Sequence, residues 1–88
     1  MTLILTEWKK QEDGGWVVQV YGLPGCITQG KDEREARLNA IECYLMFQDS
    51  MEDEGLPMPW DQSFERVWPD SELRWVRIEH SEKVERGI

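Results

Sequence analysis

Carboxylates are the side chains of this sequence with the greatest capacity for chemistry. The chain of 88 residues carries 18 Asp and Glu. Carboxylates that converge in a pocket can act as general acids and bases or hold the metal ions of a nuclease. Their spacing here does not indicate convergence, because a large group falls on one predicted helix whose exposed face must be polar. These are Glu33, Glu35, Glu42, Asp49, Glu52 and Glu54.

The other reactive side chains add little to an enzyme hypothesis. His80 is the only histidine and lies near the C-terminal end of the sequence, where few neighbours can hold a general base in place. Cys26 and Cys43 have no adjacent histidine to activate them, and we interpret both as small core residues. Two cysteines and one histidine fall short of a zinc site unless carboxylates or a second chain contribute, and a disulfide framework needs more cysteines. The sequence therefore predicts no catalytic residue, no metal and no cofactor.

The net charge limits the classes of partner. At pH 7 the formal charge is −8, which opposes binding to nucleic-acid phosphates and to acidic lipid surfaces. A basic protein is the natural complement of such a chain, although the charge can also serve only to keep a small domain soluble. The sequence shows no signal peptide and no apolar run of membrane-spanning length, so we expect a cytoplasmic protein.

Three strands are predicted before any helix. Thr2–Trp8 and Trp16–Tyr21 are short, apolar and β-branched, and Asp13-Gly14-Gly15 between them is typical of a hairpin. The turn at Pro24-Gly25 precedes a brief third strand, Cys26–Gln29. Alternation along the second strand gives both of its faces apolar side chains. We expect an antiparallel meander that is covered at least partly on both sides.

One long helix follows the meander. Asp32 and Glu35 have the spacing of a capping box, and no Pro or Gly occurs after them until Gly55. The sequence therefore predicts a helix from Asp32 or Glu33 to about Glu54, ended by the left-handed conformation that glycine adopts readily.

The predicted helix carries two apolar stripes on nearly opposite sides. The first is expected to pack on the sheet and comprises Ala36, Ala40, Cys43, Tyr44, Phe47 and Met51. The second is predicted to be covered by the following loop or offered to a second copy of the chain, and comprises Leu38, Ile41 and Leu45.

A fourth strand closes the predicted domain. Glu72–Glu79 alternates so that Leu73 and Trp75 share one face while Val76 and Ile78 share the other. We expect a single domain over residues 1–80 and a polar, frayed tail over residues 81–88. The fold class is α+β, with the order β-β-β-α-β and one helix packed on the sheet.

Several blocks of residues resemble the HicB-like antitoxin family. They lie between Gly14 and Pro59, and their order and spacing are fairly specific. The resemblance implies a partial ribonuclease-H-like fold, and such a fold does not by itself imply nuclease activity. The blocks are Gly14–Val18, Leu23–Gly30, Glu35-Ala36, Asn39-Ala40 with Glu42, and Gly55–Pro59.

The resemblance implies a protein that neutralises a toxin. HicB-like domains bind HicA, a small basic ribonuclease, and block its catalytic surface. We expect a stand-alone member without the DNA-binding domain that many full-length antitoxins append. The first alternative is a homo-oligomeric structural or regulatory domain, a dimer, with no toxin partner. The second and weaker alternative is a metal-dependent nuclease on the ribonuclease-H-like fold. Because interfaces favour aromatic anchors, the predicted partner contacts are Trp60, Asp61, Glu65, Trp68 and Trp75, although the tryptophans could equally form the core of so small a domain.

Overall fold

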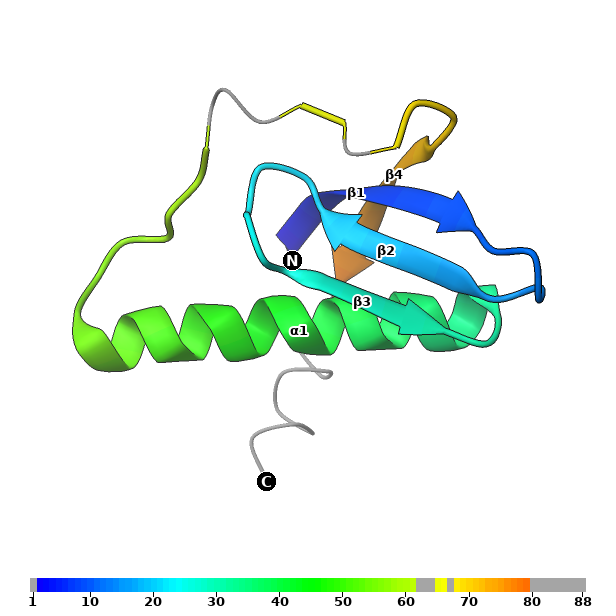
Figure 1. Ribbon diagram of the computed structural model, residues 1–88. Coiled ribbons are helices and arrows are strands. Elements are labelled where there is room, and N and C mark those ends of the chain that lie inside the picture. The colour runs from blue at the N-terminus through cyan, green and yellow to red at the C-terminus, as the bar shows by residue number, and fades with distance from the viewer. Residues whose placement is uncertain (1, 62–64, 67, 80–88) are drawn as a thin grey trace.

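The computed structural model describes residues 2–61, 65–66 and 68–79 and contains one sheet and one long helix (Figure 1). The predicted order β-β-β-α-β is confirmed. The predicted tail at residues 81–88 lies outside the described residues. The elements are β1 (Thr2–Lys10), β2 (Trp16–Val20), β3 (Ile27–Gly30), α1 (Glu33–Glu54) and β4 (Glu72–Ile78).

The four strands form an antiparallel sheet in the order β3-β2-β1-β4. The first three strands are the predicted meander. The hairpin between β1 and β2 is closed by Gly14, at φ 93°, and by Asp13, whose Oδ1 accepts the Gly15 N–H at 2.9 Å. β4 then pairs with the free side of β1, from Thr2 opposite Ile78 to Trp8 opposite Glu72.

The ends of α1 follow from their capping residues. The Asp32 Oδ1 accepts the Glu35 N–H at 2.8 Å, and the Glu35 Oε1 accepts the Lys31 N–H at 2.9 Å. Two backbone donors that the helix cannot satisfy internally are thereby paired. Gly55 ends the helix at φ 69°, and the Leu56 N–H bonds to the Met51 carbonyl at 2.8 Å. This is the expected glycine C-cap.

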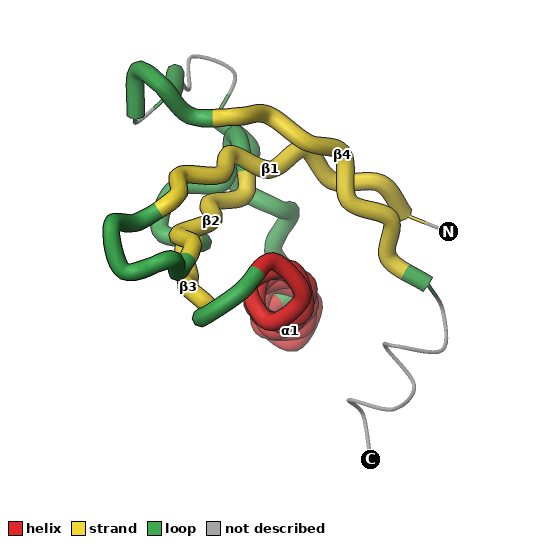
Figure 2. Tube along the Cα trace, turned by 90° about the vertical axis from the view of Figure 1, so that its right-hand side faces the viewer, coloured by secondary structure: helices red, strands yellow, loops and turns green. Residues whose placement is uncertain are grey.

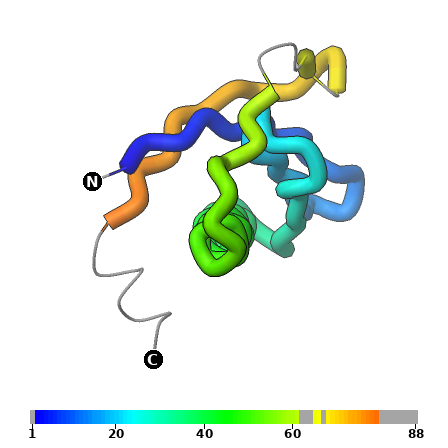
Figure 3. The backbone as a smooth tube through the Cα atoms, turned by 90° about the vertical axis from the view of Figure 1, so that its left-hand side faces the viewer, coloured from blue at the N-terminus to red at the C-terminus, as the bar shows by residue number. Residues whose placement is uncertain are grey.

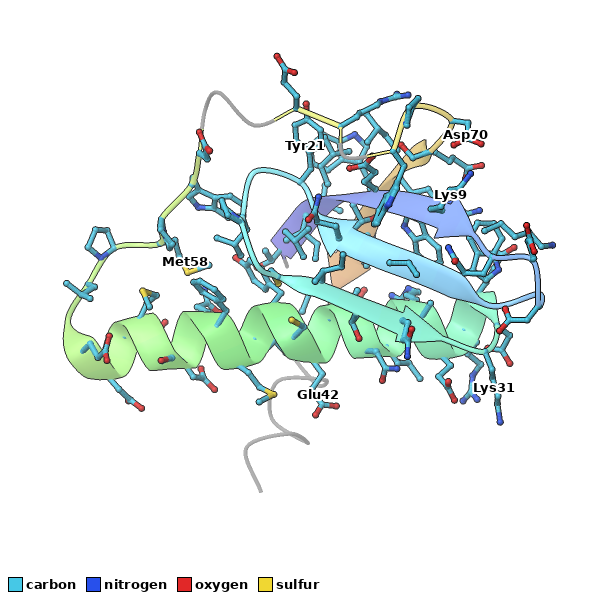
Figure 4. All side chains as sticks on the ribbon, viewed as in Figure 1. Lys9, Tyr21, Lys31, Glu42, Met58 and Asp70 are labelled. Carbon is cyan, nitrogen blue, oxygen red and sulfur yellow. The ribbon has the colours of Figure 1, made fainter. Side chains whose placement is uncertain are left out.

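Replacing Asp32 with alanine should destabilise the domain by about 1 kcal/mol, because the first turn of α1 loses the acceptor of the Glu35 N–H. For a domain of this size that loss lowers the melting temperature by about 4–8 °C, measurable by circular dichroism. Glu42→Ala is the matched control, since Glu42 is an exposed carboxylate in the same helix, away from its ends (Figure 4). An Asp32 variant as stable as the control would contradict the capping role.

The core lies between α1 and the concave face of the sheet. Figure 2 shows the strands curling around the helix axis, with β4 flanking it on one side. Gly30 allows the closest approach, because a Cβ there would lie 2.3 Å from the Ala36 backbone nitrogen. The buried apolar residues are Ile4, Trp8, Val18, Val20, Leu23, Cys26, Ala36, Ala40, Ile41, Tyr44, Leu45, Val76 and Ile78.

The curl of the sheet corrects one expectation about the helix. Ile41 and Leu45 were predicted to lie on a stripe that the sheet leaves uncovered. Both are only 3% exposed and belong to the same buried cluster as Val76 and Ile78 of β4. A flat sheet buries one face of a helix, whereas this curled sheet also covers its flank. Leu38, at 43% exposed, is the accessible member of the predicted set.

A long connection leads from α1 to β4. It leaves the helix at Gly55, rises past the turn between β2 and β3, and reaches the far side of the sheet (Figures 1 and 3). The Asp61 N–H bonds to the Gly22 carbonyl at 2.7 Å and so fixes the connection to that turn. At its other end Asp70 forms an ion pair with Lys9 at 2.5 Å (Figure 4). This connection carries most of the predicted partner contacts.

Candidate functional site

The five predicted partner residues fall into two groups. Trp60 and Asp61 lie beside the C-terminal half of α1, at the turn between β2 and β3. Trp68 and Trp75 lie on the face of the sheet that points away from the helix. Glu65 is exposed on the connection between these two groups. The structure therefore offers two candidate surfaces rather than one.

The first surface, which we call the Trp60 corner, comprises Leu56, Met58, Trp60 and Asp61. Trp60 is 48% exposed, with its ring centroid 6.2 Å from that of Tyr44 in α1. Beneath it, Gly22 takes a φ of 86°, and a Cβ at that position would lie 3.5 Å from the indole. Met58 packs on the core between the connection and the helix (Figure 4). Leu56, by contrast, is exposed. The corner is thus a rigid base under two exposed apolar side chains.

The last turn of α1, which precedes Leu56 of the Trp60 corner, is acidic. The last turn of α1 holds no basic residue, and Glu52, Asp53 and Glu54 are all exposed there. The negative end of the helix dipole favours cations at this position and disfavours carboxylates. The acidic turn therefore lowers the stability of the free protein.

The second surface, which we call the outer patch, lies on β1 and β4 and comprises Leu3, Leu5, Leu73 and Trp75. The strand register places Leu5 directly opposite Trp75. Trp75 is 67% and Leu3 54% exposed, although both belong to strands whose opposite faces are buried. The sequence indicated that both faces of the sheet would carry apolar side chains, and this patch is the part that the connection does not cover.

A buried carboxylate holds the connection against the outer face of the sheet. Glu7 is fully buried, and its Oε2 accepts the Trp68 N–H at 3.0 Å and the Ser71 hydroxyl at 2.7 Å. A buried carboxylate is tolerated only when such donors satisfy it. Sequence reasoning missed this role, because Glu7 is separated from Trp68 by 61 residues and nothing near Glu7 announces its partners.

The two cysteines meet inside the core. The Cys26 thiol donates to the Cys43 sulfur at 3.3 Å, and both cysteines are free thiols. Burial, and then the hydrogen bond to Cys43, raises the pKa of the Cys26 thiol well above its ordinary value. A thiol with a raised pKa is a poor nucleophile at neutral pH, which agrees with the interpretation of Cys26 as a core residue.

The described residues contain no evident metal centre. Within residues 2–61, 65–66 and 68–79, no three His, Cys, Asp or Glu side chains are placed to hold an ion. His80 lies outside these ranges. The helix found in the same ranges, α1, contains too few apolar residues to cross a membrane.

No family model matches the sequence. A UPF0150 protein of Thermoplasma acidophilum is 41% identical over 64 residues, which cover 73% of this chain and 88% of that protein. A UPF0150 protein of Archaeoglobus fulgidus is 50% identical over 48 residues, which cover 51% of this chain and 70% of that protein.

A solved structure shares the fold. The crystal structure of the N-terminal domain of the antitoxin HicB from Burkholderia pseudomallei superposes with a TM-score of 0.68, covering 89% of this chain and 99% of that one. Its sequence identity is 14%, so the likeness concerns the fold. The arrangement of sheet and helix predicted from the HicB resemblance is therefore confirmed, and the chain belongs to the UPF0150 family, with the fold of the HicB antitoxin N-terminal domain.

Proposed function

We propose that this protein is a non-catalytic binding module that neutralises a small basic ribonuclease of the HicA type by covering its active surface. The observation that carries the proposal is the fold, shared with the N-terminal domain of a HicB antitoxin at a TM-score of 0.68. The formal charge of −8 supports it, because an acidic protein associates rapidly with a basic one.

The Trp60 corner is the surface at which we place the toxin. Trp60 and Leu56 provide exposed apolar area on a fixed backbone, and aromatic side chains of this kind often anchor interfaces. Exposed carboxylates occur at Asp61, next to Trp60, and at Glu52, Asp53 and Glu54, in the helix turn that precedes Leu56. A basic enzyme surface would gain apolar burial and charge pairing at once. Glu65 is a further exposed carboxylate on the connection.

The first test is co-purification of the chain with the product of any small basic open reading frame beside its gene. A complex that survives gel filtration and suppresses RNA cleavage by that product supports the proposal. The proposal is contradicted if the two proteins elute separately from gel filtration. It is also contradicted if RNA cleavage continues at full rate when this chain is in excess.

Two substitutions at the corner should separate binding from folding. Glu54→Lys should raise the stability of the free protein by about 0.3–1 kcal/mol, because a cation replaces a carboxylate at the negative end of α1. The same change should weaken toxin binding. Most damaging substitutions, by contrast, reduce both the stability of the free protein and its affinity for the toxin. Trp60→Ala should raise the dissociation constant about tenfold or more, measured by isothermal titration calorimetry.

The control for these variants is Leu38→Ala, which removes a similarly exposed apolar side chain from α1 away from the corner. Its toxin affinity should equal that of the unmodified chain. Equal losses in Leu38→Ala and Trp60→Ala would place the toxin elsewhere. A Glu54→Lys variant that binds the toxin unchanged would show that the acidic turn plays no part in recognition.

A further inference from the structure

The sheet has two edges, β3 and β4, and one side chain of α1 bonds to a backbone carbonyl at each of them. At the β3 edge, the Asn39 Nδ2 of α1 donates to the Gln29 carbonyl at 2.8 Å, so a helix side chain caps this four-residue strand. β4 is longer, with seven residues from Glu72 to Ile78. Unpaired edge strands expose backbone donors and acceptors that invite another strand, and proteins commonly block them.

The strand register shows which backbone groups of β4 face outward. The Tyr21 N–H bonds to the Leu5 carbonyl at 2.9 Å, so the odd-numbered residues of β1 point toward β2 and the even-numbered ones toward β4. Thr6 pairs with Arg74, which makes the even-numbered residues of β4 face β1. The N–H and C=O groups of Leu73, Trp75 and Arg77 therefore point to the free edge.

Little in the described part of the chain occupies that edge. The Arg77 carbonyl accepts the Arg37 Nη2 at 3.0 Å, and this bond is itself evidence that the odd-numbered carbonyls of β4 face away from β1. Among residues 2–61, 65–66 and 68–79, nothing bonds to the outward backbone groups of Leu73 and Trp75. The exposed outer patch lies directly beside this edge, because Leu73 and Trp75 belong to both.

We propose that β4 pairs antiparallel with β4 of a second copy of this chain, about a two-fold axis at Trp75, to form one continuous sheet of eight strands, four from each copy. The outward N–H and C=O groups of Trp75 then bond to those of its counterpart. This inference does not depend on the proposed toxin. It concerns a surface distinct from the Trp60 corner and from the predicted set around Leu38.

The charge along β4 favours a second copy over an unrelated strand. The chain carries a net −8 overall, yet β4 holds one acidic and two basic residues, Glu72, Arg74 and Arg77. Two copies can therefore meet here without the repulsion that their acidic surfaces create elsewhere. The helix side chains that reach β4 are Arg37, at the Arg77 carbonyl, and Glu33, which is paired with Arg74.

The two-fold register also avoids like charges in direct opposition, which destabilise paired strands. Leu73 would stand opposite Arg77 of the second copy, and Trp75 would have that arginine as a diagonal neighbour, within reach of a cation–π contact. The direct pairs would be Glu72 with Ile78, Leu73 with Arg77, Arg74 with Val76, and Trp75 with Trp75.

The experiment measures self-association of the isolated protein by sedimentation equilibrium. The unmodified chain should form dimers. Trp75→Glu should raise the dimer dissociation constant about thirtyfold or more, because it removes an aromatic anchor and sets two carboxylates face to face. Ile27→Glu is the matched control: Ile27 is also exposed and lies on the same face, but on β3 at the opposite edge of the sheet, so its dimer should be unchanged.

A mixing experiment tests the two-fold register itself. Trp75→Glu and Trp75→Lys should each be monomeric and folded, and their equimolar mixture should restore a heterodimer, because the opposite charges then meet. A monomeric unmodified chain at all concentrations would overturn the proposal, as would a Trp75→Glu dimer of unchanged strength or a mixture that stays monomeric. Since no toxin is present, these results are independent of the proposed function, and Trp75→Glu should still bind the toxin through the Trp60 corner.

Discussion

Gly30→Ala is expected to destabilise the domain by about 3 kcal/mol or more, a large share of the about 5–15 kcal/mol that holds a typical domain together. The added Cβ would lie 2.3 Å from the Ala36 nitrogen, 2.7 Å from the Ala36 Cα and 2.8 Å from the Glu35 carbonyl carbon. All three are backbone atoms of the first turns of α1, so no side chain can rotate away. β3 and α1 must separate to make room.

Chemical denaturation and thermal melting measure this loss, with Gly55→Ala as the control. Gly55 has a φ of 69°, but a Cβ there would meet nothing within 4 Å. Its substitution should therefore cost only the left-handed backbone strain of an L-residue, about 1–2 kcal/mol. If Gly30→Ala proves no more damaging than Gly55→Ala, β3 and α1 are not packed as tightly as the structure shows.

Trp8→Ala should cost about 3–5 kcal/mol, the usual range for removing a buried aromatic side chain. Trp8 is 3% exposed, and its Nε1 donates to the Thr6 hydroxyl at 2.7 Å. Its ring meets that of Trp16 edge-on at 5.7 Å and lies 4.4 Å from the Arg74 guanidinium. Arg74 is held in turn by Glu33 of α1 at 3.0 Å. The truncation therefore leaves a cavity and loosens a contact between β4 and the helix.

Trp75→Ala is the matched control for Trp8→Ala, because Trp75 lies on the neighbouring strand and is 67% exposed. We expect its free energy of unfolding to stay within about 0.5 kcal/mol of the unmodified value when the protein is measured as a monomer. Urea denaturation followed by far-ultraviolet circular dichroism compares the two variants directly. Similar losses in both would mean that Trp75 contributes to the fold rather than to association.

The elements of this fold were predictable because their signals are local. Asp32, Glu35 and Gly55 lie within one turn of the helix ends that they cap, and the structure places α1 at Glu33–Glu54 as their spacing predicts. The glycines of the hairpin fixed the pairing of β1 with β2 in the same way. The helix ends and the pairing of β1 with β2 each depend on a few neighbouring residues.

The surfaces were harder to predict because they depend on three-dimensional curvature and on a long connection. Ile41 and Leu45 have helical positions that a flat sheet would leave uncovered, and only the curl toward β4 buries them. Trp60 and Trp75 appear equivalent in the sequence, yet the path of the connection puts them on different sides of the sheet. The burial of Glu7 likewise depends on donors 61 and 64 residues away.

The pairing of β1 with β4 has a consequence for how the domain forms during synthesis. Thr6 and Arg74 are bonded across 68 residues, so the first strand to leave the ribosome waits for nearly the whole domain before its second neighbour arrives. Contacts of such long range slow folding, since a large loop must close before they form. Until β4 is made, β1 is an unpaired edge strand of a three-stranded sheet. Its backbone groups are then accessible to proteases and chaperones.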